Sequence, residues 1–115
     1  MKIVINKKLF IIKFAYHVHE DVLSDTYQRE TVCYIKVIGL DTKEDEEPIT
    51  IVSESASCDS RDNFVKAKGR AIAFKRALTQ LFGSDIREEQ GLNHEHYVIF
   101  MSTFKEECST SVEFI

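Results

Sequence analysis

The sequence predicts an α+β fold: an antiparallel sheet of four to five strands, with one long helix and a possible short second helix packed on it. Several stretches alternate apolar and polar residues at period two and are rich in β-branched and aromatic residues. One stretch, Asn63–Phe82, repeats instead at the helical period. The chain has 115 residues, which is enough for a single domain, 1–115, and too few for two.

The strands and the long helix are expected in the order β-β-β-α-β along the chain. In the first of them, Phe10, Ile12 and Phe14 fall on one side, and the N-terminal segment 1–14 as a whole is interpreted as strand. A short segment at the end of the chain, 111–115, is a candidate fifth strand. The four main strands are expected at Leu9–Glu20, Thr31–Leu40, Ile49–Ser57 and His96–Phe104.

Composition and charge restrict the partners. The formal net charge is -4, so we expect no general attraction to nucleic acid or to anionic lipid, and any anion site must be a local basic cluster. No apolar run reaches the length of a membrane span and no signal peptide is evident. Cys33, Cys58 and Cys108 are odd in number and lack metal-type spacing, which favours the reducing cytoplasm.

The predicted helix has two different sides. One side carries an apolar stripe that should pack on the sheet. Asp59, Ser60 and Asp62 precede the helix as candidate N-caps, and Gly83 is expected to end it. A short helical segment is expected after Gly83, bounded by Gly91. The apolar stripe consists of Phe64, Ala67, Ala71, Phe74, Leu78, Leu81 and Phe82.

Small residues lie across the helix from this stripe, at Gly69, Ala73 and Ala77, with Arg70 and Arg76 on either side of them. A glycine inside a helix costs roughly 1 kcal/mol relative to alanine, so this small ridge needs an explanation. It could face solvent or lie under the short second helix, it could contact a second subunit, or its arginines could bind phosphate. Planar guanidinium groups suit phosphate because they donate paired hydrogen bonds.

The sequence contains two H-x-H pairs, His17 with His19 and His94 with His96. In a strand, the two histidines of such a pair would point to the same face of the sheet. Such pairs could meet at a four-histidine metal site, or they could be exposed polar residues at strand ends, which is the interpretation adopted. The sequence has no nucleophile motif, no phosphate-binding glycine loop and no dinucleotide fingerprint. We therefore expect no enzyme activity, no metal and no cofactor.

The segment around this helix resembles a pattern of small phage and prophage proteins of Gram-positive bacteria. The pattern is a cysteine, a polar turn with an aspartate, a phenylalanine, and then G-R-x-[I/L]-A-x-x-R-A. Some phage proteins of this size look like anti-Thoeris sponges, which sequester cyclic ADP-ribose-type signals of a bacterial defence system. The family often has a proline where this chain has Ser60. The matching residues are Cys58, Asp62, Phe64, Gly69, Arg70, Ile72, Ala73, Arg76 and Ala77.

The resemblance implies a non-enzymatic phage counter-defence protein, cytoplasmic in an infected bacterial host, that binds a nucleotide-like ligand as a homo-oligomer. The alternative is an acidic inhibitor of a host nucleic-acid-binding or CRISPR effector protein, with the acidic loop 41–48 as its contact. A double-stranded-RNA-binding domain also ends in three strands and a basic helix, but its first helix is missing here. The expected ligand-binding residues are Arg70, Arg76, Lys66 and Lys75 for phosphates and Phe82 for a base.

Overall fold

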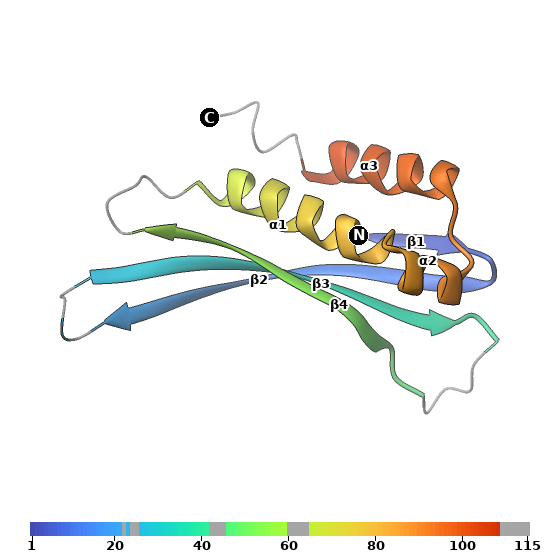
Figure 1. Cartoon of the computed structure of the whole chain (residues 1–115), viewed down its shortest axis with the longest axis horizontal. Helices are drawn as coiled ribbons and strands as arrows, with labels where there is room; N and C mark the ends of the chain where they lie inside the picture. The colour runs from blue at the N-terminus through green and yellow to red at the C-terminus, as the bar shows by residue number, and fades with distance from the viewer. Residues whose placement is uncertain (22, 24–25, 42–45, 60–64, 109–115) are drawn as a thin grey trace.

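Four strands are followed by three helices in the computed structural model, which describes residues 1–21, 23, 26–41, 46–59 and 65–108. The strands form one antiparallel sheet in the order β1-β2-β3-β4, and the helices lie on one of its faces (Figure 1). The predicted α+β class, with one long helix and a short second one, is therefore confirmed. The elements are β1 (Lys2–Ile5), β2 (Lys8–Asp21), β3 (Thr26–Gly39), β4 (Ile49–Asp59), α1 (Lys66–Leu81), α2 (Ser84–Gln90) and α3 (His94–Cys108).

The N-terminal segment, interpreted as strand, forms a hairpin of β1 and β2. The two residues between them, Asn6 and Lys7, have φ of 53° and 61°. Two consecutive positive φ values are typical of the type I′ turn, whose twist matches that of the flanking strands. The Asn6 amide donates a hydrogen bond of 2.8 Å to the carbonyl of Gly91, the left-handed residue that ends α2. This bond ties the hairpin to the helical layer.

The strand predicted at His96–Phe104 is wrong, because this segment belongs to helix α3. Asn93 begins the helix: its Oδ1 accepts hydrogen bonds from the backbone N–H groups of Glu95 and His96 at 3.0 and 3.3 Å. The apolar residues that face the core follow helical spacing, although their β-branched neighbours favoured a strand. The fourth strand is β1 instead, and the segment 111–115 lies outside the described residues. The core-facing residues of α3 are Tyr97, Phe100, Met101 and Phe104.

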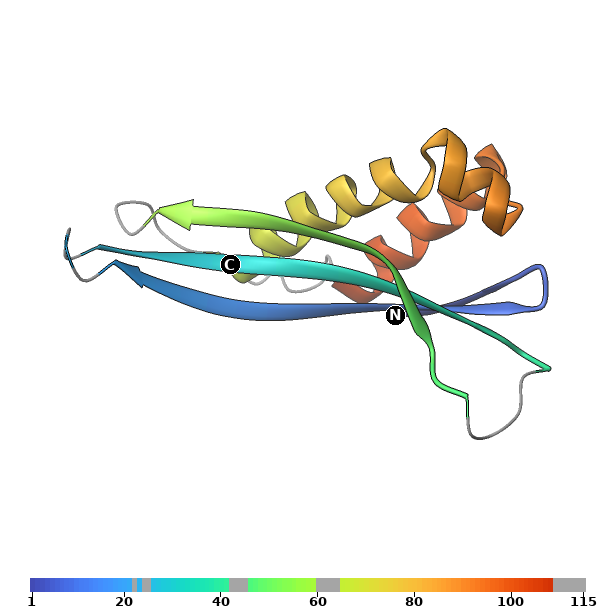
Figure 2. The same cartoon turned by 60° about the horizontal axis from the view of Figure 1, so that its bottom comes forward.

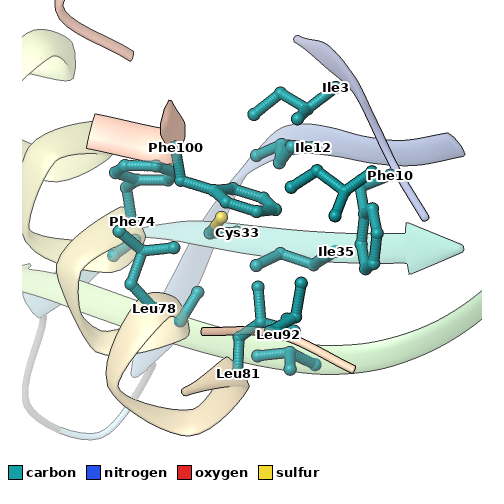
Figure 3. Packing of buried hydrophobic residues seen from close by; sticks show 14 of the residues in the cluster. Ile3, Phe10, Ile12, Cys33, Ile35, Phe74, Leu78, Leu81, Leu92 and Phe100 are labelled. Carbon is teal, nitrogen blue, oxygen red and sulfur yellow. The ribbon is translucent and has the colours of Figure 1, made fainter. Parts of the chain in front are cut away.

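The hydrophobic core lies between the sheet and the helices (Figure 3). The predicted alternation in β2 and β3 is confirmed, because Phe10, Ile12, Cys33 and Ile35 are at most 2 % exposed. Cys33 is fully buried in this core. Phe100 of α3 is fully buried among them.

The buried surface of helix α1 is wider than the single apolar stripe that the sequence predicts. Phe74 faces α3, where its ring stacks on Phe104 with centroids 4.3 Å apart. Ala73 and Ala77 of the small ridge are 0 % exposed and belong to the core. The two arginines beside the ridge bond to β2 and β4, so the ridge between them faces the sheet. The sequence predicts that the large stripe packs on the sheet, but the ring of Phe74 in this stripe packs on α3. The sequence leaves the contacts of the small ridge open, and in the structure the ridge faces the sheet.

The start of α1 also differs from the expectation. Asp59, a candidate N-cap, is the last residue of β4, and the helix begins later, at Lys66. The other two candidate caps, Ser60 and Asp62, lie outside the described residues. At the other end, α1 stops at Leu81, and α2 follows directly and is closed by Gly91, as predicted.

Candidate functional site

The sheet is longer than the helix that covers its centre. β2 and β3 have 14 residues each and α1 has 16, which corresponds to about 46 Å of strand and about 24 Å of helix. The end of the sheet where β2 finishes therefore projects past α1 (Figure 1). Tyr16 and Val18 continue the row of core residues Phe10 and Ile12, yet they are 40 % and 66 % exposed. A partly exposed aromatic ring thus stands beside the start of α1.

Two cations of α1 converge on this ring. Arg70 Nη1 donates a hydrogen bond of 2.9 Å to the Tyr16 hydroxyl. Lys66 Nζ lies 4.7 Å from the centroid of the same ring, in a cation–π contact. Lys66 and Arg70 are four residues apart and so share one side of the helix. These three residues, the Tyr16 cluster, bring two positive charges together next to an aromatic surface.

The described start of α1 carries basic rather than acidic side chains. Val65 occupies the N-cap without a side-chain hydrogen bond, and the first turn contains no acidic residue. Lys66 and Lys68 are found there instead. Because the N-terminal end of a helix carries a partial positive charge, acidic residues normally stabilise it and basic ones do not. The partial positive charge of this helix start thus adds to the two cations of the Tyr16 cluster.

A buried hydroxyl lies in the same row of the sheet. Thr31 is the cross-strand neighbour of Tyr16, so the two side chains lie on the same face. Thr31 is 0 % exposed, and its Oγ1 has no hydrogen-bond partner within the described part of the chain. A buried hydroxyl without a partner costs about 1–3 kcal/mol. The hydroxyl of Thr31 is thus a polar group beside Tyr16 that is closed to solvent.

The structure separates the other predicted ligand residues from this cluster. Arg76 points to the opposite side of α1 and donates a hydrogen bond of 2.7 Å to the carbonyl of Ser55 in β4. Lys75 is exposed. Phe82 packs edge-to-face on Tyr97 and Phe100, with centroids 5.3 and 5.8 Å apart. Phe82 lies twelve residues after Arg70, which is about 18 Å along a helix, so the two do not form one site within a chain.

The two histidine pairs do not meet. His17 and His19 point to the face of the sheet away from the helices, and His19 Nε2 lies 3.3 Å from Glu30. His94 and His96 lie at the start of α3, on the helical side, where His96 accepts a hydrogen bond from the Asn93 N–H. The strand predicted from His96 onward is a helix, so the second pair does not lie at a strand end. Within the described ranges, no group of three histidine, cysteine or acidic residues is placed to hold a metal ion.

Tyr16 is the site residue that the sequence did not single out. Its period-two position assigned it to the core row with Phe10 and Ile12. The signal that could have identified it is length, since the strand predicted at Leu9–Glu20 is longer than a helix over Asn63–Phe82 can cover. Where a strand extends beyond the helix that covers it, its row of core-facing residues must end in exposed aromatic or apolar side chains.

The fold and site define a two-layer α+β protein with a basic cluster at the uncovered end of its sheet. No protein-family model, no curated protein and no solved structure matches the chain. Among the residues that the structure describes, no helix is long and apolar enough to span a lipid bilayer.

Proposed function

We propose that the protein binds a cyclic nucleotide-type signal at the Tyr16 cluster and withholds it from its receptor. The observation that supports this proposal best is the convergence of Lys66 and Arg70 on the exposed ring of Tyr16. A nucleotide combines a phosphate with a flat base, and this cluster combines two cations with an aromatic ring. Sequestration requires tight binding and slow release, and no chemical step is involved.

Each residue of the cluster has a distinct role in this proposal. The Arg70 guanidinium turns from the phenol to the phosphate and donates paired hydrogen bonds. Lys66 adds a second positive charge from the first turn of α1, where the helix N–H groups also favour an anion. Tyr16, freed of the two cations, offers its ring to the base; such stacking contributes about 1–3 kcal/mol per base.

A second copy of the chain completes the site. The Tyr16 cluster lies on a projecting end of the sheet, and ligand sites that bind tightly bury most of their ligand. A two-fold arrangement that brings two such ends together would enclose the nucleotide between four cations. The proposed working form is therefore a homo-oligomer.

The biological setting comes from the resemblance in the α1 region. Arg70, Ala73, Arg76 and Ala77 match the phage pattern, and a sponge for a defence signal would act in the cytoplasm of an infected bacterial host. The rival proposal is an acidic inhibitor of a host nucleic-acid-binding or CRISPR effector protein. Its described acidic residues include Glu46 and Glu47, both exposed.

Calorimetric titration of the folded protein with cyclic ADP-ribose isomers and cyclic oligonucleotides tests the proposal. We expect heat from at least one of these compounds and, by light scattering, a particle of at least two chains. Glu46→Lys with Glu47→Lys should leave that heat unchanged. Absence of heat from every compound, or a monomer that stays monomeric with ligand, would refute the sponge and leave the acidic inhibitor.

A further inference from the structure

The face of the sheet opposite the helices carries no other layer in the described part of the chain (Figure 2). On this open face, side chains from all four strands stand in cross-strand rows that the register defines. One row joins Lys2, Ile11 and Lys36, and the next joins Lys13, Tyr34 and Ser53. The register therefore collects three lysines from β1, β2 and β3 around one tyrosine.

The three lysines belong to no ion pair within the described ranges of the chain. Lys2, Lys13 and Lys36 form no ion pair with any residue that the structure describes. Glu30, an acidic residue of the same face, contacts His19 at 3.3 Å and lines one hollow together with Tyr34. The protein thus has a local positive area although its formal net charge is -4. Composition predicted no nucleic-acid partner because it reports only the net charge.

Two shallow hollows of the open face meet at Tyr34. One has a volume of about 410 Å³ and is lined partly by His17 and Ser53 and by two carboxylates, Glu30 and Glu54. The other has a volume of about 310 Å³ and is lined partly by Lys13 and Lys36. Tyr34 lines both. A half-buried aromatic ring therefore stands between a basic hollow, where the phosphates are expected, and a polar hollow that also contains carboxylates.

We propose that the open face binds single-stranded nucleic acid, a partner beyond the nucleotide ligand proposed for the other face. Lys13 and Lys36 contact phosphates, with Lys2 extending the track, and a base stacks on Tyr34. Proteins bind single strands without sequence preference by this combination of a basic groove and an aromatic platform. A duplex fits less well because its bases are stacked on one another and cannot reach Tyr34.

Fluorescence anisotropy with a labelled oligothymidine of about ten nucleotides tests this inference on the full chain. Tyr34→Ala should weaken binding between about 5-fold and 150-fold, while Tyr34→Phe should retain it. With three lysines on phosphates, the slope of log K against log salt should be about -2, and Lys13→Gln with Lys36→Gln should reduce its magnitude by about 1.4. The matched control, Lys75→Gln, removes one exposed charge from the helical side and should change nothing.

Further variants and competitors distinguish this site from the Tyr16 cluster and from binding by charge alone. Lys66→Gln with Arg70→Gln disables the Tyr16 cluster and should leave oligothymidine binding unchanged. A blunt duplex and polyglutamate should compete poorly; equal competition by polyglutamate would mean that the face selects charge alone and would overturn the proposal. Absence of oligothymidine binding at low salt would also overturn the proposal. So would binding that is unchanged both by Tyr34→Ala and by the double lysine substitution, provided that each variant has the circular dichroism spectrum of the wild type.

Discussion

Arg76 donates a hydrogen bond of 2.7 Å from its guanidinium to the carbonyl of Ser55, in the strand at the edge of the sheet. Arg70, six residues earlier, reaches to the other side of α1 and bonds to the hydroxyl of Tyr16. The two arginines that flank the small ridge in the sequence thus hold the helix to two different strands. Arg76 contacts the backbone of an edge strand, whereas Arg70 contacts a side chain beside a helix start without acidic residues.

Replacement of Arg76 by alanine should lower the stability of the fold. The substitution leaves the Ser55 carbonyl without its guanidinium partner, and a hydrogen bond of this kind contributes about 0.5–1.5 kcal/mol net. Urea denaturation should show this decrease in the free energy of unfolding, with Lys75→Ala as the exposed neighbour that changes it by less than about 0.5 kcal/mol. Exposed edge strands also promote association, so the variant should aggregate more readily. Equal stability of the two variants would show that the bond does not hold α1 on β4.

The aromatic contacts of α3 lead to a second prediction. Phe100 is 0 % exposed and packs edge-to-face against Phe10 and Phe82. Phe100→Ala should therefore cost about 3–5 kcal/mol, because it removes a buried ring and leaves a cavity. Val98, which is 51 % exposed on the same helix, provides the control, and Val98→Ala should cost less than about 0.5 kcal/mol. Thermal unfolding of both variants measures these losses of stability. A larger loss for Val98→Ala than for Phe100→Ala would contradict the position of α3.

The small ridge of α1 leads to a third prediction. Ala77 is 0 % exposed on the side of α1 that faces the sheet, so a larger side chain has no room. Ala77→Leu should destabilise the protein by about 1–3 kcal/mol, because overpacking moves the helix away from the strands. Gln80 is exposed on the same helix, and Gln80→Leu should be tolerated. If Ala77→Leu instead changed only the oligomeric state, measured by light scattering, the ridge would be a subunit contact, as the sequence allowed.

The strands of the sheet could be predicted because their periodicity is set by the alternation of the backbone. Phe10, Ile12 and Ile35 occupy the predicted period-two positions of their strands, and all are buried as expected. The segment His96–Phe104 could not be assigned in the same way, since Val98 and Ile99 favour a strand locally while tertiary contacts of Phe100 with Phe10 favour a helix. The cap at Asn93, three residues before His96, is the local signal that decides in favour of the helix.

The candidate site could be predicted only in part. The sequence places Arg70 beside the small ridge and offers Lys66 as a phosphate candidate, and both side chains contact the same tyrosine. This partner, Tyr16, is at least fifty positions earlier in the chain, and only the packing of α1 on the sheet brings it near. Arg76 and Phe82 share the helix with Arg70 but point into contacts of their own, which a helical projection cannot show.

Calorimetric titration of three proteins with the cyclic ADP-ribose isomers tests the central claim most directly, namely that the Tyr16 cluster binds a nucleotide. The wild type should release or absorb heat, and Arg70→Ala should weaken binding by about 10-fold to 150-fold, as expected for loss of a hydrogen bond to a charged group. Arg76→Ala, although less stable, should bind with the wild-type affinity at a temperature where it is folded. Binding that survives Arg70→Ala but disappears with Arg76→Ala, or no heat from the wild type with any isomer, would contradict the claim.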